Sequence, residues 1–351
     1  MLENNNNEKK YCRHEAHIVY ASDNKFAEIL GVSLLSLFEN SRDMKIIHVY
    51  ILDSGIDETN KKRIEWICGK YKRNKPLWIK ARDIIKELKI DVSVDRGSLA
   101  QYARLFISRD LPENISRVLY LDCDTLITKS IYELWNLDLH GKTIAALEDA
   151  FSPLYRKNIN LKKKDLMFNS GVMLIDLDRW KQFHIEKKLL NIILEKDGMI
   201  QQGDQGALNA VLSDDVYCFI PKFNSVTIFF DFTYEEMLIY RKPHNFYSKD
   251  VVLDAVTDPS IIHFTTSFLS RRPWVEGCNH KYCDLWLSFK EKSPWKNKEL
   301  CKDNKSIWVK LGIVMFHIFP RKFSIFLAGI LQAYGRPIFN GFILKLKSME
   351  K

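Results

Sequence analysis

Asp122 and Asp124 follow the apolar run VLYL (118–121) and are separated by a single residue. Two carboxylates held so close together repel each other, and a divalent cation between them turns that repulsion into attraction. Hard oxygen ligands suit Mg²⁺ or Mn²⁺, and such sites commonly combine one or two carboxylates with substrate phosphates. The metal then acts as a Lewis acid toward a leaving diphosphate. The alternative is a strand that ends in solvated carboxylates, which a DxD pattern alone does not exclude.

Strand-like runs alternate with segments of helical periodicity around these aspartates. The expected strands and helices lie at 17–22, 26–40, 46–52, 58–71, 77–81, 98–110 and 117–122, beginning with a strand. This alternation predicts βαβ units and a mainly parallel, doubly wound α/β sheet. Ligands of such sheets bind beyond the carboxyl ends of the strands. The polar clusters at 22–24 and 122–124 are both expected at that edge.

Three later segments carry further polar residues. An Asn-Ser-Gly tripeptide (169–171) leads into a strand, an Asp-Gln pair (204–205) stands where a loop enters a helix, and His263 belongs to a strand at 261–264. Neither GxGxxG nor GxxxxGK[ST] occurs, which argues against a dinucleotide dehydrogenase and a P-loop NTPase. Residues 11–295 show no internal repeat or low-complexity linker, so we expect one continuous domain there.

The stretch QYARLFISRDLPENISRVLYLDCDTLITKSIYELW resembles the core of the family 8 retaining glycosyltransferases. Further family motifs follow in the family order: ASDNKFAEILGVSLLSL, FNSGVMLIDLDRW, GDQGALN, IIHF and RPW. The resemblance covers roughly residues 15–295. It implies a GT-A fold, which is a Rossmann-like, mainly parallel sheet flanked by helices. It also implies a UDP-sugar donor and, in most members, a bound Mn²⁺.

By this resemblance, Asp122, Asp124 and His263 hold the metal. An imidazole beside two carboxylates favours Mn²⁺, with Mg²⁺ as the alternative. A lone histidine on an apolar strand is more often a core residue with satisfied hydrogen bonds, and only the neighbouring DxD favours a ligand here. Cys123 is expected to face the opposite way, toward the core, where it contributes packing.

The same resemblance assigns a set of residues to the UDP-sugar: Ala21, Asp23, Arg104, Asp122, Cys123, Asp124, Asn169, Asp204, Gln205 and Arg272. Ala21 and Asp23 match positions that hold uracil and ribose. Arg272 takes the place of a family lysine on the diphosphate and offers a fork of donors, although the segment HFTTSFLSRRPW is longer than its family counterpart. The residues alone leave other roles open, because Asp23 and Asp204 could be helix N-caps and Arg104 could lie on a helix surface.

Asp204 and Gln205 are the implied catalytic residues. An aspartate that accepts hydrogen bonds from two sugar hydroxyls forms a charge-assisted contact, while Gln205 would lie under the anomeric carbon. An amide oxygen is not anionic and is a poor nucleophile, and no carboxylate nucleophile like that of retaining glycosidases is evident at this position. The resemblance therefore implies a front-face mechanism. The leaving diphosphate deprotonates the acceptor, and the Gln205 carbonyl stabilises an oxocarbenium-like transition state.

The positive charge of the chain is concentrated near its C-terminus. From Cys301 onward, nine Lys/Arg oppose two acids, a net charge of +7, which leaves about +2 of the formal +9 for the preceding residues. The polar N-terminus MLENNNNEKKYCRHE lacks the apolar core of a secretory signal. The seven cysteines are scattered, without a CxxC pair. We therefore expect a cytoplasmic, reducing location without a disulfide framework or a zinc ribbon.

Residues 296–351 are predicted to form a basic, amphipathic, helical tail. Its apolar stretches, 306–319 and 322–335, are uninterrupted for only ~10–12 residues, short of the ~20 that span a bilayer. Pro320 and Pro337 are expected to interrupt them. Short apolar helices with cationic edges suit a membrane interface, which predicts a peripheral protein on the inner face of the cell membrane. The alternative is that these helices pack on the catalytic domain.

Two classes of function remain in view. The first is a retaining, metal-dependent transfer of glucose or galactose from a UDP-sugar to a saccharide of lipopolysaccharide or another lipid-linked or cell-wall glycan. The second is a catalytically inactive nucleotide-sugar-binding or membrane-adaptor protein with the same fold. A nucleotidyltransferase is disfavoured by FNSGV, GDQ and His263, and nucleic acid is disfavoured as a partner of the apolar tail. Loops such as 149–164 and 225–250 are expected to contact the acceptor.

Overall fold

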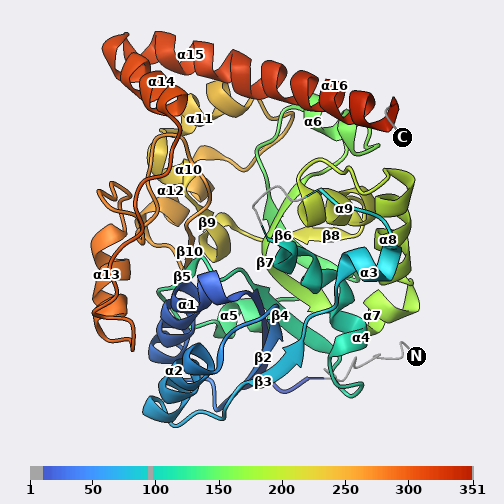
Figure 1. Cartoon of the computed structure of the whole chain (residues 1–351), viewed down its shortest axis with the longest axis vertical. Coiled ribbons are helices and arrows are strands. Elements are labelled where there is room, and N and C mark those ends of the chain that lie inside the picture. The colour runs from blue at the N-terminus through green and yellow to red at the C-terminus, as the bar shows by residue number, and fades with distance from the viewer. Residues whose placement is uncertain (1–10, 94–97, 350–351) are drawn as a thin grey trace, which may run out of the picture.

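A seven-stranded sheet forms the centre of the computed structural model, which describes residues 11–93 and 98–349 (Figure 1). The strands lie in the order β3-β2-β1-β4-β7-β6-β8. They are β1 (Glu15–Ser22), β2 (Ile46–Asp53), β3 (Leu77–Lys80), β4 (Arg117–Leu121), β6 (Ile144–Glu148), β7 (Phe168–Asp176) and β8 (Val216–Cys218). Every neighbouring pair is parallel except the two pairs that β7 forms. The predicted mainly parallel α/β sheet is confirmed.

Helices cover both faces of this sheet because its central strands are apolar on both sides. In β1, Ile18 and Tyr20 point into one core and Val19 points into a second core on the opposite face. The first core is covered by α1 (Ala27–Asn40), α2 (Glu58–Lys70), α5 (Tyr132–Trp135) and α13 (Cys283–Glu291). The second is covered by the 3₁₀ helix η2 (Leu99–Phe106), α4 (Ile107–Asp110), α7 (Leu177–Gln182), α8 (Ile185–Glu195) and α9 (Gly203–Leu212).

A second sheet of three short strands lies beside the end of β4. Its order is β5-β10-β9, with β5 (Thr125–Ile127), β9 (Ser225–Val226) and β10 (Ile261–His263). β5 begins directly after Asp124, and its Thr125 pairs with His263 in antiparallel register. This pairing places His263, at the end of β10, next to the DxD segment, although the two are far apart in the sequence.

β7 runs against its neighbours, so its first residues lie at the edge where the parallel strands end. The backbone N–H of Asp122 donates to the carbonyl of Gly171 at 2.7 Å, which joins the end of β4 to the start of β7. Asp23 follows the end of β1 at the same edge. Polar residues from several segments therefore gather at the edge that the sequence predicts.

The segment 98–110 differs from its prediction as one continuous helix. It forms the 3₁₀ helix η2 followed by the short helix α4. Residues 102–106 are all buried, because the segment inserts between β1 and α9. Tertiary packing has here overridden the helical pattern.

Several short helices connect the sheets and lead toward the tail. They are η1 (Asn24–Phe26), α3 (Ile84–Leu88), α6 (Pro153–Asn158), η3 (Pro221–Asn224), α10 (Ile228–Asp231), α11 (Tyr234–Arg241) and α12 (Lys249–Thr257). Of these, α6 and α11 contact the C-terminal helices (Figure 1).

The tail consists of α14 (Ile307–Ile318), α15 (Arg321–Ile330), a π-helical turn (Leu331–Gly335) and α16 (Arg336–Met349). The run from α15 to α16 forms a long rod across one end of the molecule, shown in red in Figure 1, and α14 packs beside its start. Pro320 separates α14 from α15, as predicted. The prediction that Pro337 interrupts the second helix is wrong, because the helical chain continues through it. The wider π turn directly before Pro337 makes room for the proline ring.

Two other expectations concern the membrane and the cysteines. Within residues 11–93 and 98–349, no helix combines the length and the apolar character needed to cross a bilayer. All seven cysteines have free thiols. The sequence predicts no disulfide framework, and the structure has no disulfide among these cysteines.

Candidate active site

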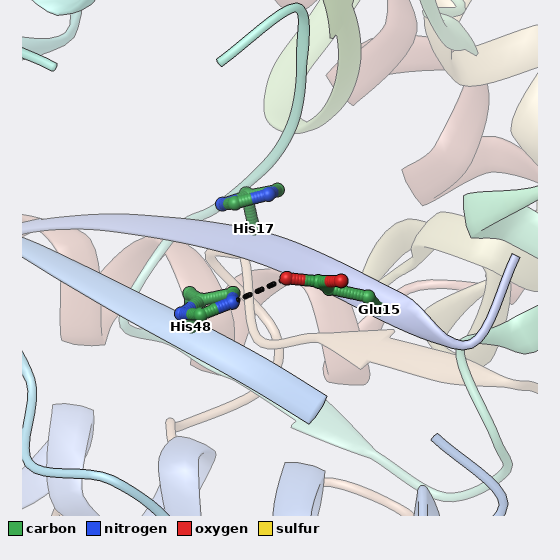
Figure 2. Close-up of side chains that lie close together, drawn as sticks. All are labelled: Glu15, His17 and His48. Carbon is green, nitrogen blue, oxygen red and sulfur yellow. Dashed lines mark hydrogen bonds and ion pairs between the residues drawn. The ribbon is translucent and has the colours of Figure 1, made fainter. Parts of the chain in front are cut away.

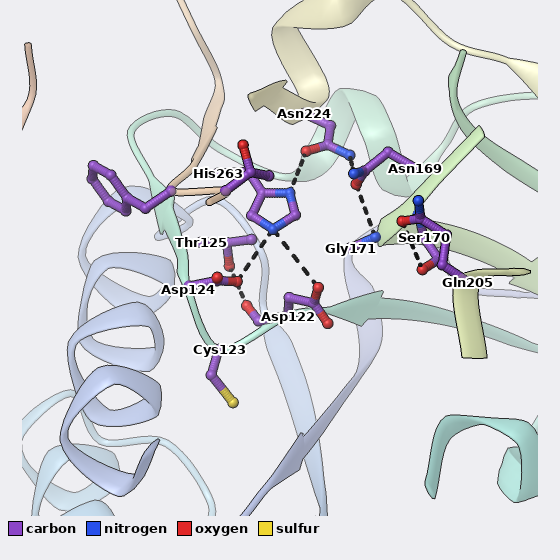
Figure 3. Close-up of polar contacts among 12 residues, drawn as sticks. Asp122, Cys123, Asp124, Thr125, Asn169, Ser170, Gly171, Gln205, Asn224 and His263 are labelled. Carbon is purple, nitrogen blue, oxygen red and sulfur yellow. Dashed lines mark hydrogen bonds and ion pairs between the residues drawn. The ribbon is translucent and has the colours of Figure 1, made fainter. Parts of the chain in front are cut away.

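The carboxylates of Asp122 and Asp124 face the imidazole ring of His263 (Figure 3). Nε2 of His263 lies 3.2 Å from Oδ1 of Asp124 and 3.7 Å from Oδ2 of Asp122. All three residues are buried, and their ligand atoms lie within 4.8 Å of one another. The structure thus brings together the three predicted ligands, while their role as ligands stays a prediction.

Asn224 orients the ring of His263. Nδ2 of Asn224 donates to Oδ1 of Asn169 at 3.0 Å, so the Asn224 oxygen faces Nδ1 of His263 at 2.9 Å. An amide oxygen only accepts, and Nδ1 of His263 must therefore carry the proton. In the neutral ring Nε2 is then an acceptor. It is buried, has no hydrogen-bond partner, and faces the carboxylates of Asp122 and Asp124, which are acceptors as well. A divalent cation between these atoms would resolve the conflict, and one imidazole with two carboxylates suits Mn²⁺.

Gly171 allows β7 to pass directly behind the His263 ring. A Cβ atom at this position would lie 2.1 Å from Cε1 of His263 and 2.8 Å from Oδ2 of Asp122. Neither atom can retreat easily, because both side chains are buried. The glycine of the FNSGV motif is therefore a steric requirement of the three-residue cluster.

Arg104 connects the cluster to the second pair of predicted site residues. Its guanidinium donates to Asp122 at 2.6 Å and to the carbonyl of Ser170 at 2.9 Å, and its Nε lies 3.0 Å from Asp204. It also stacks over Tyr120, with 4.3 Å between guanidinium carbon and ring centroid. Burial lowers the pKa of Arg104, but the nearby charges of Asp122 and Asp204 outweigh burial and raise it. The idea of a helix-surface arginine is wrong, because the residue is 5% exposed.

Asp204 and Gln205 lie in the first turn of α9, at the same edge as the cluster. The residue that precedes this helix is Gln202, in the left-handed conformation with φ of 66°. Asp204 is therefore not the N-cap, and its carboxylate faces Arg104 instead. The Gln205 amide oxygen accepts a hydrogen bond from the N–H of Ser170 at 3.2 Å. This contact ties α9 to β7, and the same strand carries Asn169.

Asp23 and Ala21, the residues predicted to hold the nucleoside, lie at the end of β1, and their role stays a prediction. One oxygen of Asp23 caps η1 by accepting from the N–H groups of Lys25 and Phe26, and the other accepts from Ser98 at 2.7 Å. The capping role considered for Asp23 is confirmed. The thiol of Cys123 points away from the cluster (Figure 3) and donates to the carbonyl of Ala21 at 3.2 Å. Burial raises the pKa of this thiol, in agreement with a packing role.

Arg272 is the cation that the long segment after β10 contributes. Its Nη2 lies 3.5 Å from Oδ2 of Asp124, and its Nε donates to the carbonyl of Phe264 at 3.0 Å. Arg271 instead pairs with Asp303 at 3.0 Å. Of the two arginines of RRPW, Arg272 is thus the one beside Asp124, and its contact with a diphosphate stays a prediction.

Two residues near the site carry no signal in the sequence that singles them out. Asn224 ends η3 in an ordinary apolar context, and only the fold brings it between His263 and Asn169. Asp149 follows β6, whose Leu147 pairs with Asn169, and its N–H donates to the carbonyl of Met167 at 2.8 Å. Burial raises the pKa of Asp149, and the charge of Arg241 opposes this shift. Asp149 lies in the segment 149–164, one of the loops expected to contact the acceptor.

A second group of possible ligands lies near the starts of β1 and β2, at the ends of these strands away from the candidate active site (Figure 2). It consists of Glu15, His17 and His48. His48 Nε2 is 2.7 Å from Glu15, and the two histidine rings stack with centroids 4.7 Å apart and an angle of 11° between their planes. Ring nitrogens bind a metal in the plane of the ring, so two stacked parallel rings do not aim at one ion. In this arrangement the group supports the pairing of β1 with β2.

The sequence matches the family described as "Glycosyl transferase family 8" over residues 17–277. It is 31% identical to general stress protein A of Bacillus subtilis, over 80% of this chain and 94% of that protein. It is 28% identical to lipopolysaccharide 1,2-glucosyltransferase of Escherichia coli, over 83% and 82% of the two chains. It is 26% identical to lipopolysaccharide 1,3-galactosyltransferase of Salmonella typhimurium, over 80% and 79%.

Among solved structures, the fold is similar to the galactosyltransferase LgtC, crystallised with donor and acceptor sugar analogs. The TM-score is 0.67 at 22% sequence identity, and the match covers 80% of this chain and 99% of LgtC. At this identity the likeness shows the fold, and the GT-A architecture expected from the sequence is confirmed.

Proposed function

Because the chain belongs to glycosyltransferase family 8, we propose that it transfers glucose or galactose from a UDP-sugar to a saccharide acceptor with retention of anomeric configuration. The observation that carries this proposal is the buried cluster of Asp122, Asp124 and His263, joined through Arg104 to Asp204.

The donor is proposed to lie along the edge of the sheet. Ala21 and Asp23 would hold the uridine, and Arg272 would contact the diphosphate beside Asp124. Asp204 pairs with Arg104 at 3.0 Å, and a carboxylate is a strong acceptor for sugar hydroxyls. Asn169 lies on the strand that Gln205 contacts and is oriented through its contact with Asn224. The arrangement offers a positive charge to the diphosphate and polar acceptors to the sugar hydroxyls.

The three-residue cluster is proposed to hold Mn²⁺. When bound, such an ion neutralises negative charge that develops on the leaving diphosphate. The residues then have defined tasks: Arg104 keeps the Asp122 and Asp204 carboxylates in place, and the Gln205 amide lies against the strand that carries Asn169. Since Gln205 is not a carboxylate, we propose a front-face reaction. The acceptor hydroxyl loses its proton to the departing diphosphate oxygen as the new glycosidic bond forms.

The acceptor is proposed to be a saccharide of a surface glycan, such as lipopolysaccharide or another lipid-linked or cell-wall glycan. Two relatives carry lipopolysaccharide glucosyl- and galactosyltransferase in their names. Segments 149–164 and 225–250 are proposed to contact it. Asp149, at the start of the first segment, follows the pairing of Leu147 with Asn169 and is therefore close to the proposed sugar position.

We further propose that the tail attaches this cytoplasmic protein to the inner face of the membrane. One side of the tail packs on the body, and the other exposes large apolar side chains: Trp308, Val314, Ile318, Phe323, Phe326, Leu331, Ile338, Phe339 and Phe342. Lys310, Lys322 and Arg336 are exposed on the same helices. Apolar side chains with flanking cations fit an anionic lipid surface.

Vesicle sedimentation tests the attachment. The triple variant Trp308→Ser, Phe323→Ser and Phe339→Ser should lose most binding to vesicles that contain anionic phospholipid, whereas wild type should bind them better than zwitterionic vesicles. Equal sedimentation of the variant and the wild type would show that the tail is not the anchor.

Release of UDP tests the enzyme. Wild type with UDP-glucose or UDP-galactose and a glycan acceptor should release UDP only with Mn²⁺ present, and Asp124→Ala should abolish this release. Binding of UDP-sugars without turnover, across both donors and a panel of acceptors, would instead support a nucleotide-sugar-binding adaptor.

A further inference from the structure

The segment 149–158 connects the candidate active site to the C-terminal tail. It begins at Asp149, whose N–H donates to the carbonyl of Met167 at 2.8 Å directly after Leu147 of β6 pairs with Asn169 of β7, and it ends with the short helix α6. Arg156 holds the segment together by donating to the carbonyl of Phe151 at 2.9 Å. In Figure 1, α6 lies directly beneath the rod formed by the tail.

Three side chains of this segment donate to backbone carbonyls of the tail helix. Ser152 Oγ donates to the carbonyl of Ala333 at 2.6 Å, and Tyr155 Oη to that of Gln332 at 3.2 Å. Asn158 Nδ2 donates to the carbonyl of Pro337 at 2.9 Å.

These carbonyls are available because of Pro337. In an α-helix its N–H would serve Ala333, and in a π-helix it would serve Gln332, but proline has no N–H. A buried carbonyl without a donor costs free energy, and Ala333 is fully buried. Ser152 and Tyr155 supply the two missing donors. The irregular turn of the tail is therefore built to receive this segment.

The tail also approaches the body closely through glycine. A Cβ on Gly329 would lie 2.5 Å from the carbonyl oxygen of Ile239 in α11, so only glycine fits there. Asn158 donates a second bond to the side-chain oxygen of Gln201 at 2.6 Å. Gln201 precedes the turn that leads into Asp204, so the tail is connected to a second segment of the site.

We propose that the helical run from Arg321 to Met349 is a positioning element of the acceptor side, which holds the segment 149–158 against the site. The inference rests on the proposed function, because it assigns Asp149 and its segment to the acceptor side. The proposed contacts to the uridine and the diphosphate come from other elements, namely the ends of β1, β4 and β10, and those to the donor sugar come from β7 and α9. Loosening the tail should therefore weaken acceptor use and leave the donor reaction intact, since misplacement of about 1 Å costs about 100-fold in rate.

A matched pair of glycine substitutions in the full-length chain tests this. Gly329→Ala places a methyl group against the α11 backbone, whereas Gly335→Ala, two turns away on the exposed side, meets only ordinary contacts at 3.8 and 4.0 Å. With a soluble acceptor and no membrane, Gly329→Ala should raise the acceptor KM or lower kcat about tenfold. Its affinity for UDP-sugar and its release of UDP to water should match wild type. Gly335→Ala should match wild type in every measurement.

Asn158→Asp and Ser152→Ala probe the same contact from the body. The carboxylate introduced by Asn158→Asp would face the carbonyl of Pro337 and the Gln201 oxygen, and it has no hydrogen to donate to either. Asn158→Asp should therefore reproduce the acceptor-specific loss. Ser152→Ala should show a weaker form of the same loss. The proposal is overturned if Gly329→Ala and Asn158→Asp keep the wild-type acceptor parameters, or if donor and acceptor parameters fall together. Failure of the proposed function is distinct, since wild type itself would then release no UDP.

Discussion

The hydrogen bond between His263 and Asn224 decides which imidazole nitrogen faces the two aspartates. With Nδ1 committed as a donor at 2.9 Å, only Nε2 can contribute a lone pair toward Asp122 and Asp124. Residues of this kind commonly tune metal affinity without touching the ion. At the residue scale, then, the site depends on Asn224 and Gly171 as well as on the predicted ligands.

Asn224→Ala should lower the affinity for Mn²⁺ about 10–100-fold, because the His263 ring loses its orienting acceptor. The measurement is the Mn²⁺ concentration that gives half-maximal UDP release. Excess Mn²⁺ should restore most of the rate. Asn191→Ala, on the exposed side of α8, serves as the control. An unchanged Mn²⁺ dependence in Asn224→Ala would contradict this role.

Gly171→Ala should abolish most activity, because its Cβ would lie 2.1 Å from the His263 ring and the ring must move. A shift of this size is expected to cost at least about 100-fold in UDP release. Gly69→Ala in α2, where a Cβ meets nothing within 4 Å, should leave the rate unchanged. Circular dichroism shows whether both variants are folded, and a fully active Gly171→Ala would refute the steric argument.

At the scale of elements, α13 is held to α1 by a buried ion pair. Lys290 Nζ lies 2.5 Å from Glu28, and both side chains are 6% exposed. Lys298 also reaches Glu28 at 2.9 Å. The loop that carries Arg272 lies between β10 and α13, so this pair fixes one end of a segment that enters the site.

Lys290→Met should reduce the free energy of unfolding by roughly 3 kcal/mol, because it leaves Glu28 buried with only one partner. The nearby pair of Lys292 with Glu39 has a lysine that is 46% exposed, so Lys292→Met should cost less than about 1 kcal/mol. Urea denaturation of the two variants measures the difference. Equal midpoints would show that burial of the Lys290 pair contributes nothing.

At the scale of the whole molecule, two histidines tie stability to pH. Burial, with a smaller effect of Lys281, lowers the pKa of His280 to about 4, and burial together with His48 lowers that of His17 to about 4. Their ordinary value is 6.5. The unfolded chain therefore binds more protons between these values, so the stabilisation is complete above pH 6.5 and is lost as the pH falls toward 4.

The urea midpoint of the wild type should accordingly decrease as the pH is lowered from 7 to 4.5, and the midpoint of His280→Gln should decrease less. For His280 alone the loss is at most about 3 kcal/mol; the more exposed His17 should contribute less. Parallel pH profiles of the wild type and His280→Gln would exclude His280 as a source of the acid sensitivity.

Local patterns in the sequence determined much of this molecule. Apolar runs and helical spacing predicted β1, α1, β2, α2 and β4, because long strands and helices repeat their burial over several residues. The polar residues after these strands were predicted at one edge, because parallel strands end together. The predicted ligands Asp122, Asp124 and His263 do lie together there.

Tertiary structure alone decided the rest. A strand of two residues, such as β9, is too short to show a period, and Asn224, directly before it, reaches His263 only because β9 pairs with β10. Leu99–Phe106 became a 3₁₀ helix because its five buried residues are covered from both sides. Pro337 does not end its helix because Ser152 and Tyr155, far away in the chain, donate to the carbonyls it leaves open. Contacts between distant segments have no local signature, so the sequence alone could not reveal them.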